Sequence, residues 1–341
     1  MQNVRSGIEN MLANSRDTPI LHGLTEVEFI RDILSTNALG REPNQELTGF
    51  EARILKKHLR KVIIDYTLRF GDSTRGCIGL YRESDKRLGR TFSVLETLTS
   101  NGFGPEDKLR VPKPIAYIPA LSFLMIERAE GRILREIFER SENPYPYVKG
   151  AAQWIAKLHN SEIKLDYTHS QDKEIETSLR YTRTASWLLP RLESEVHSLA
   201  AKLVRVQKAL RTAPRKTIHG DYHPRNIIVS PEITTVIDFE EAGMGDPAFD
   251  VGYFIAQTKM THGTQESTVR ATDTFFEEYT KDQPNLRPDF AQRVAVFEAQ
   301  TYFQRIYHTY YLLQLKPDLD RITEWLNECK TSLNKASDGE Q

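Results

Sequence analysis

The residues of this chain that could do chemistry gather in one short stretch. His219, Gly220 and Asp221 stand together, Asn226 follows after four intervening residues, and Asp238 comes twelve positions after Asn226. A carboxylate on a loop, here Asp221, can accept the proton of a substrate hydroxyl group. An amide oxygen from Asn226 and a carboxylate from Asp238 are hard ligands that suit Mg²⁺. Bound Mg²⁺ orients nucleotide phosphates and neutralises part of their charge, which phosphoryl transfer requires more than it requires covalent chemistry.

Two short strands are expected to position Asn226 and Asp238. The segments 226–230 and 234–237 are rich in isoleucine, valine and threonine, and the sequence Ser-Pro-Glu stands at the turn between them. Runs of β-branched residues on both sides of such a turn predict a hairpin. Because a hairpin brings its open ends together, we expect Asn226 at one end and Asp238 at the other to share one ion.

The sequence HGDYHPRN at 219–226, together with IDFE at 237–240, resembles the aminoglycoside phosphotransferase and choline kinase family. That family shares the protein-kinase-like fold, with His-Gly-Asp in place of the His-Arg-Asp of protein kinases. The resemblance implies an ATP-dependent small-molecule kinase that transfers the γ-phosphoryl group to a hydroxyl group. ATP and Mg²⁺ are the implied cofactors, and a small-molecule hydroxyl acceptor is the implied partner.

The resemblance also implies a role for each residue of the motif. Asp221 matches the catalytic base of the family, and Asn226 and Asp238 match its metal ligands. The downstream sequence GDPAFD resembles another part of the family pattern, whose last aspartate usually braces the catalytic loop. Asp250 is therefore expected to be structural, and His219 is expected to be a structural residue of the loop rather than a ligand.

Three rival interpretations compete with an active small-molecule kinase. His219, Asp221 and His223 alternate along the chain and could hold Zn²⁺, but no further histidine or cysteine stands nearby to complete a closed site. A non-catalytic nucleotide-binding protein or regulatory pseudokinase is the main alternative, because parts of the expected nucleotide site are missing. A protein kinase is disfavoured, because the chain has no recognisable Ala-Pro-Glu activation segment.

The hydrophobic pattern predicts an α+β protein with a two-lobed protein-kinase-like fold. A small antiparallel β-rich lobe is expected first and a larger, mostly helical lobe second. The expected boundaries are a helical extension over 1–50, a nucleotide-binding lobe over 51–129, and a catalytic and acceptor-binding lobe over 130–335. Within the first lobe the pattern predicts strands over 52–57, 62–70, 77–82 and 122–126, a turn over 71–76 and a helix over 88–98.

The second lobe is predicted to be helical on both sides of the central hairpin. Apolar residues recur at helical spacing over 133–140, 148–159 and 174–210, and Pro190 is expected to break the last of these. The aromatic run 302–311 is expected to pack in the core, with a wall of the acceptor pocket as the alternative.

The nucleotide site departs from the family pattern in two places. The strand lysine of the family maps to Arg82, with Lys86 as the second candidate, and a solvated strand-end arginine is the competing interpretation of Arg82. The helix glutamate that should pair with that lysine maps near Thr91, with Glu96 about a turn later. Neither residue is a convincing replacement for the glutamate.

Two backbone elements are expected to contact the nucleotide. Protein-kinase-like enzymes cover the phosphates with a glycine-rich loop, but residues 52–66 contain no glycine. Backbone amide groups, or Arg60 and Lys61, would have to contact the phosphates instead. The adenine is expected to bond to main-chain groups between Glu127 and Ala129, which follow the last strand of the first lobe.

The composition excludes several other classes of protein. The chain has 341 residues, of which 46 are basic and 47 acidic, so its net charge of -1 gives no field to attract nucleic acid. Two cysteines do not make a disulfide framework and suit a reducing compartment. Neither a signal peptide nor an apolar run of membrane-spanning length is visible. A cytoplasmic protein is expected, with no membrane and no nucleic acid among its partners.

The identity of the acceptor is not encoded in any motif that we can read. Glu240 and Glu241 form either a solvated charge pair or part of a surface for a cationic acceptor. Participation of Asp246 in an acidic pocket would also favour a cationic acceptor, whereas a neutral pocket would favour a sugar. The choice between ATP and GTP and the oligomeric state are equally open.

Overall fold

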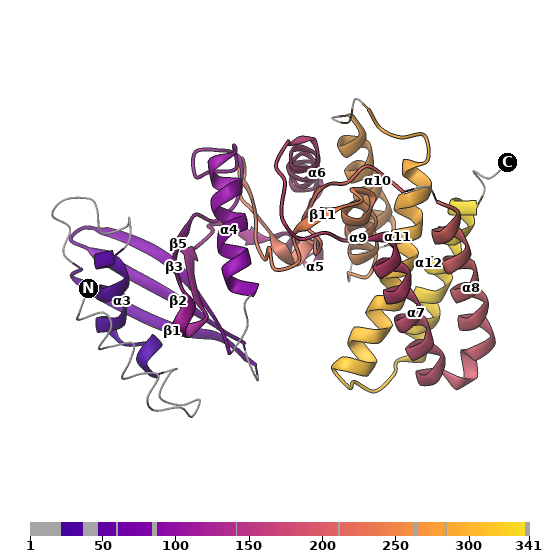
Figure 1. Cartoon of the computed structure of the whole chain (residues 1–341), viewed down its shortest axis with the longest axis horizontal. Coiled ribbons are helices and arrows are strands. Elements are labelled where there is room, and N and C mark those ends of the chain that lie inside the picture. The colour runs from indigo at the N-terminus through magenta and orange to yellow at the C-terminus, as the bar shows by residue number, and fades with distance from the viewer. Residues whose placement is uncertain are drawn as a thin grey trace. The chain divides into compact units, whose positions relative to one another are not determined.

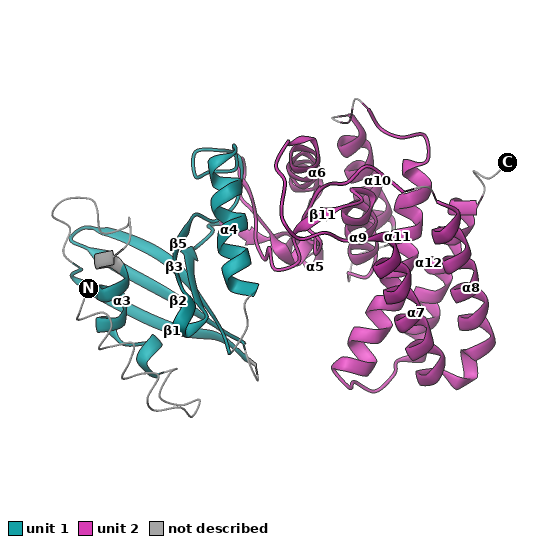
Figure 2. Ribbon diagram, viewed as in Figure 1, with its two compact units in different colours: residues 1–130 teal, residues 131–341 magenta. Residues whose placement is uncertain are grey.

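The structure is a computed structural model, and the chain divides into two compact units, Met1–Glu130 and Gly131–Gln341 (Figure 2). Arg60 and Lys86, both considered above for phosphate binding, lie outside the described residues, as does much of the expected extension 1–50. The structure describes residues 22–36, 47–58, 61–83, 87–140, 142–210, 212–261, 265–281, 283 and 285–337.

A five-stranded antiparallel sheet forms the body of the first unit (Figure 1). The predicted strands are present, but the turn predicted over 71–76 is too long, because only Gly71 and Asp72 connect the second strand to the third. In spatial order, the strands are β1 (Gly49–His58), β2 (Lys61–Phe70), β3 (Ser73–Arg82), β6 (Phe123–Glu127) and β5 (Pro114–Ile118).

One face of this sheet is buried beneath a helix. Alternate residues of β2, from Val62 to Phe70, are buried, as the side-chain period of a strand requires. Helix α3 (Val27–Thr36) packs on the same face, where Phe29 meets Phe123 edge to face at 5.2 Å. The Tyr66 hydroxyl donates a hydrogen bond to the carbonyl oxygen of Leu24 at 2.8 Å. The described helix of segment 1–50 therefore shares a core with the sheet.

Two further features complete the first unit. Helix α4 (Arg87–Ser100) packs against β5 and β6, and its Phe92 stacks on Tyr117 at 6.1 Å. Gly79 lies so close to two rings that an added Cβ would come within 2.6 Å of Tyr66 and 2.8 Å of Phe123. A glycine is required there for the strand to approach its neighbours. The short strand β4 (Leu109–Arg110) follows the helix.

The second unit is mostly helical (Figure 1). The long helical segment predicted over 174–210 is broken at Pro190, as expected, by a 3₁₀ turn over Pro190–Leu192. The helices are α5 (Leu134–Glu139), α6 (Tyr145–Asn160), α7 (Gln171–Leu188), α8 (Glu193–Ala209), α9 (Ala248–Lys259), α10 (Gln265–Lys281), α11 (Phe290–Ile306) and α12 (Leu319–Ser337).

Short strands interrupt the helices of the second unit. β9 (Ile227–Val229) and β10 (Thr234–Val236) form the predicted hairpin, and β7 (Arg132–Ile133) pairs with β9. β8 (Lys216–Ile218) pairs with β11 (Gly243–Gly245). The sequence from His219 to Asn226 therefore lies in the connection between β8 and β9.

The aromatic run near the end of α11 is largely internal. Tyr302, Phe303 and Tyr310 belong to a buried cluster with side chains of α7, α8 and α12, and a π-helical turn over Tyr307–Leu312 continues the helix. This burial favours the core-packing interpretation of the run. The predicted α+β class, with an antiparallel β-rich part followed by a mostly helical part, is confirmed. In the part of the chain that the structure describes, none of the helices combines the length and apolar character needed to cross a membrane.

Replacing Phe29 by alanine tests whether α3 is an integral part of the first unit. Phe29 is buried against Phe123, so Phe29→Ala is expected to lower the free energy of unfolding by about 3 kcal/mol, as measured by urea denaturation. The exposed neighbour Glu28 provides the control, because Glu28→Ala removes no buried contact. A loss below about 1 kcal/mol for Phe29→Ala would mean that α3 contributes little to this core.

Candidate active site

The loop that carries the motif is held by a buried carboxylate. The backbone N–H groups of His219 and Gly220 donate to the two oxygens of Asp250, at 2.7 and 2.9 Å. His159, at the end of α6, contributes Nε2 to the same carboxylate at 3.1 Å, and its Nδ1 lies 2.8 Å from the Tyr279 hydroxyl. Asp250 is fully buried, so these donors replace the water that its charge has lost.

The backbone at Gly220 takes a conformation that favours glycine. Its φ is +79°, and an added Cβ would lie 2.3 Å from the carbonyl oxygen of Glu241. Both the left-handed conformation and the close approach exclude a side chain at this position. The turn at Gly220 therefore gives the chain room to direct Asp221 away from the buried carboxylate.

His219 supports the same loop from inside the core. Its Nδ1 accepts a hydrogen bond from the Asp221 N–H at 3.2 Å, so Nε2 carries the proton that is donated to the Ile237 carbonyl oxygen at 3.0 Å. Burial lowers the pKa of His219 and keeps its imidazole neutral, although Asp250 and Asp221 oppose this effect. Both ring nitrogens of His219 are thus occupied by the protein.

The side chain of Asp221 is partly exposed, at 31%, within a ring of donors. Nδ2 of Asn226 donates to its Oδ2 at 3.0 Å, Nε2 of His223 lies 3.5 Å from the same atom, and the Tyr253 hydroxyl also donates to the carboxylate. Burial alone would raise the pKa of Asp221, but His223, His219 and Tyr253 outweigh it and hold the pKa below its usual range. Asp221 is therefore ionised at neutral pH.

The hairpin brings the backbones of the two predicted metal ligands close together. The Ile237 N–H donates to the Asn226 carbonyl oxygen at 2.9 Å, so Asp238 immediately follows the residue that bonds to Asn226. Asp238 has a left-handed backbone with φ of 67°, which turns the chain at the end of β10. Asn226 uses its amide nitrogen on Asp221, and among the described residues nothing bonds to its Oδ1.

These donors fit Mg²⁺ better than Zn²⁺. An amide oxygen and a partly exposed carboxylate leave room for water and phosphate oxygens, which complete the shell that Mg²⁺ prefers. The rival zinc interpretation of His219, Asp221 and His223 is wrong, because both nitrogens of His219 already make hydrogen bonds. Within the described residues no group of three histidine, cysteine or acidic side chains is placed to hold a metal.

An aromatic cluster anchors the loop to α6. Trp154 stacks on Tyr222 with ring centroids 5.9 Å apart and also meets Phe239 at 6.0 Å, while His219 lies 4.7 Å from Phe239. The Tyr222 hydroxyl donates to the Ala151 carbonyl oxygen at 2.7 Å. Residues directly beside Asp221 and Asp238 in sequence are thus fixed in the core, which restricts how far either carboxylate can move.

The predicted nucleotide residues lie in or directly after the sheet of the first unit. Arg82 is the last residue of β3 and is half-buried, on the opposite face from the buried Tyr81. Thr91 is buried in α4 with its hydroxyl group unpartnered among the described residues, and Glu96 is exposed. The N–H of Glu127 bonds to Lys113, whereas the N–H of Ala129 donates to none of the described residues.

The acidic residues considered for a cationic acceptor are already engaged. Glu240 is buried, so it does not form a solvated charge pair with Glu241. Asp246 accepts from Nε of Arg293 at 2.7 Å and from the Ala248 N–H at 3.1 Å. These contacts argue against an acidic acceptor pocket built from Glu240 and Asp246.

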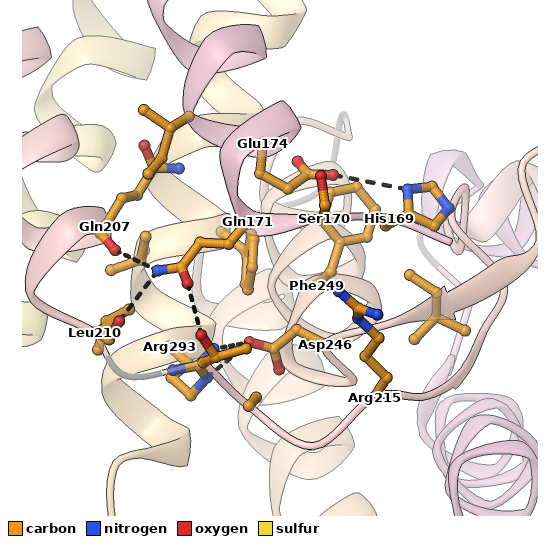
Figure 3. A pocket seen from close by; sticks show the side chains of 16 residues that line it. His169, Ser170, Gln171, Glu174, Gln207, Leu210, Arg215, Asp246, Phe249 and Arg293 are labelled. Atoms are coloured by element: carbon orange, nitrogen blue, oxygen red, sulfur yellow. Dashed lines mark hydrogen bonds and ion pairs between the residues drawn. The ribbon is translucent and has the colours of Figure 1, made fainter. Parts of the chain in front are cut away.

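A cavity of about 60 Å³ lies between the start of α7, the end of α8, the start of α9 and α11 (Figure 3). Gln171 closes it by donating to the carbonyl oxygens of Gln207 and Leu210. His169 bonds through Nε2 to the Glu241 carbonyl oxygen at 2.9 Å, the atom that faces Gly220. Asp246 lines this cavity, but its carboxylate is paired with Arg293, and none of the predicted catalytic, metal-binding or nucleotide-binding residues lines it.

Two residues beside Asp221 were not assigned a role from the sequence. Tyr253 lies three positions after Asp250 on α9, and helical spacing alone places it on the face that meets the loop. His223 accepts from the Arg225 N–H through Nδ1 at 3.1 Å, so its Nε2–H faces Asp221. The helical spacing from Asp250 is a signal that could have found Tyr253.

The fold and the loop together define a phosphotransferase of the protein-kinase-like class. The profile of the family described as "Phosphotransferase enzyme family" matches residues 65–289, which is more than half of the chain. The chain belongs to this phosphotransferase enzyme family.

Solved structures of small-molecule kinases share the fold. A choline/ethanolamine kinase family protein from Mesorhizobium loti is 15% identical with a TM-score of 0.59, over 91% of this chain and 98% of that one. Choline kinase LicA from Streptococcus pneumoniae is 16% identical with a TM-score of 0.57, over 85% and 94%. An aminoglycoside phosphotransferase in a ternary complex with ADP and hygromycin B is 14% identical with a TM-score of 0.60, over 86% and 95%.

Curated relatives match over shorter regions. Methylthioribose kinase from Escherichia coli is 34% identical over 83 residues, which cover 23% of this chain and 20% of that protein. Methylthioribose kinase from Bacillus cereus is 32% identical over 160 residues, which cover 47% of this chain and 36% of that protein. The matched regions thus span well under half the length of these relatives.

Replacing Asp250 by asparagine tests whether its charge organises the loop. An asparagine side chain would place its NH₂ group against one of the two N–H donors, those of His219 and Gly220, and would lose that hydrogen bond. Asp250→Asn is therefore expected to lower the free energy of unfolding by about 3 kcal/mol. The amide protons of His219 and Gly220 are expected to exchange faster with solvent, as measured by hydrogen exchange. Asp273→Asn, on the exposed face of α10, is the control. Unchanged exchange at both amides would contradict the bracing role.

Proposed function

We propose that this protein transfers the γ-phosphoryl group of ATP to a hydroxyl group of a small molecule, with Asp221 as the catalytic base. The observation that carries the proposal is the setting of Asp221. It is an ionised, partly exposed carboxylate on a braced loop, bonded to Asn226 and facing His223. Membership of the phosphotransferase enzyme family supports the same activity.

The low pKa of Asp221 suits phosphoryl transfer. A carboxylate held below its usual pKa is a weak base, so it binds and orients the acceptor hydroxyl group before it accepts the proton. A loose transition state requires little negative charge on the attacking oxygen. Orientation of the hydroxyl group then accelerates the reaction more than a stronger base would. The Tyr253 hydroxyl and the Asn226 amide fix the carboxylate in one position for this task.

Asn226 and Asp238 are the residues that would hold Mg²⁺. The Oδ1 of Asn226 is not used by the described residues, and Asp238 follows the hairpin bond to Asn226. When bound, the ion would supply charge neutralisation for the nucleotide phosphates.

Nucleotide binding is assigned to residues 51–129, and catalysis and acceptor binding to residues 130–335. In the first segment, Arg82 is our candidate for contact with the phosphates. The carbonyl oxygen of Glu127 and the N–H of Ala129 are the candidates for contact with adenine, since Ala129 leaves its N–H unbonded among the described residues. The buried, unpaired thiols of Cys77 and Cys329 are in keeping with a cytoplasmic location.

A non-catalytic pseudokinase is the second candidate. It is favoured by Thr91, which stands buried where the family carries the glutamate of the ion pair. It is opposed by Asp221, Asn226 and Asp238, because a protein that only binds nucleotide does not need all three.

The first experiment compares wild type with Asp221→Asn. Purified protein is incubated with Mg²⁺–ATP and a panel of alcohols, amino alcohols, sugars and aminoglycosides, and ADP release is measured. Loss of the carboxylate is expected to lower kcat about 10²- to 10⁴-fold while leaving ATP binding intact. Removal of Mg²⁺ by EDTA is expected to abolish turnover.

The same assay separates the two candidates. Asp273→Asn, an exposed carboxylate on α10, is the matched control and should retain wild-type turnover. If wild type binds ATP but no compound of the panel gives Asp221-dependent turnover, the pseudokinase is the better assignment.

The pH dependence of turnover provides a second test. Because the pKa of Asp221 is held below its usual value, its ionised form persists to a lower pH than that of an ordinary aspartate. His223→Gln removes a group that lowers this pKa, so the acid limb of kcat/KM is expected to move to higher pH. An acid limb that is the same in both proteins would mean that His223 does not tune Asp221.

A further inference from the structure

Four arginines from separate segments line one small cavity beside Asp221. Arg135 comes from α5, Arg225 from the 3₁₀ turn after the catalytic loop, Arg305 from α11 and Arg321 from α12. The cavity has a volume of about 50 Å³, enough for a small polar group. No aspartate or glutamate is among the described residues of its lining.

Three of the four arginines of this cavity have no ion-pair partner among the described residues. Arg135 makes an ion pair with Glu139 on its own helix. The guanidinium groups of Arg225, Arg305 and Arg321 make no ion pair with any residue that the structure describes. Like charges that face one cavity raise the free energy of the folded protein unless an anion binds between them.

Arg305 is the most buried of the three arginines that make no ion pair. It is half-buried, whereas Arg225 and Arg321 are exposed. Burial lowers the pKa of Arg305, and the neighbouring charges of Arg135 and Arg321 add to that effect against the opposing influence of Tyr253. An arginine stays charged in proteins, so the group remains a cation that lacks a partner.

The cavity lies against the catalytic carboxylate. His223 lines it and places Nε2 3.5 Å from Oδ2 of Asp221. Tyr253, whose hydroxyl donates to Asp221, also interacts electrostatically with Arg305. An anionic group bound to the arginines would thus be separated from Asp221 by one side chain, that of His223.

We propose that the arginine cavity is the part of the acceptor site that binds a carboxylate or phosphate group of the acceptor, so that the substrate is a hydroxyl compound bearing an anionic group. This inference rests on the proposed kinase activity and specifies its substrate class. Guanidinium groups bind both anions through paired N–H donors, which explains why arginine fills these positions. Asp221 would repel such an acceptor if the arginines did not outweigh its charge.

The test compares acceptors that differ only in the anionic group. Glycerol, glycerate and glycerol 3-phosphate form one series, and ribose and ribose 5-phosphate form another. Wild type is expected to show kcat/KM at least tenfold higher for the anionic members. Arg305→Gln is expected to raise KM for those members at least tenfold, with little change in kcat or in KM for ATP. Arg305→Lys is expected to restore part of the loss.

Two controls exclude indirect effects. Arg183→Gln removes an exposed arginine of α7 that does not line the cavity and should leave every KM unchanged. Thermal stabilisation by inorganic phosphate and by acetate is measured on wild type and Arg305→Gln without nucleotide, and stabilisation that depends on Arg305 is expected for both anions.

The outcomes separate the two proposals. Asp221-dependent turnover of alcohols with no preference for the anionic members overturns the anionic subsite and leaves the kinase activity standing. Stabilisation by inorganic phosphate alone, with no acceptor preference, also overturns it and assigns the arginines to the transferred phosphoryl group. Arg305-dependent stabilisation by both anions without turnover of any alcohol supports an anion site and counts against the kinase activity.

Discussion

The buried carboxylate of Asp250 is the constraint on which the catalytic loop depends. A carboxylate without water is very unfavourable unless donors surround it, and here the donors are the N–H groups of His219 and Gly220 and the imidazole of His159. The loop cannot move away without leaving that charge uncompensated. Main-chain geometry around Asp221 is thus set by an electrostatic requirement in the core, and Gly220 provides the left-handed turn that satisfies it.

From this constraint the chemistry of the loop follows. Asp221 is directed out of the core, where it meets the amide group of Asn226 and the Nε2–H of His223. Asn226 would have two tasks under the proposed function, since its nitrogen bonds to Asp221 and its oxygen is not used by the described residues. The hairpin β9–β10 links these tasks to Asp238 through one backbone hydrogen bond. A small number of hydrogen bonds therefore connects the proposed base and the proposed metal ligands with the core.

The charges around this loop are unevenly distributed. Asp246 is neutralised by Arg293 and Glu240 is buried, whereas Arg225, Arg305 and Arg321 have no ion-pair partner among the described residues. The first unit shows a different departure from the family pattern, because Thr91 buries a hydroxyl group where a charged partner for Arg82 was expected. Family membership thus defines the fold and the loop, but the surroundings of each charge are particular to this chain.

The sequence by itself determined the features that depend on neighbouring residues. Strand pleating, turn chemistry and loop spacing are local properties of the chain. The sequence therefore predicted the alternation along β2, the helix break at Pro190, the β9–β10 hairpin and the motif from His219 to Asp238. Only the tertiary structure decided that Asp250 and Glu240 are buried and that four arginines from separate segments meet at one cavity. The electrostatics of a site depend on groups that packing brings together from distant parts of the chain, and no local pattern encodes that convergence.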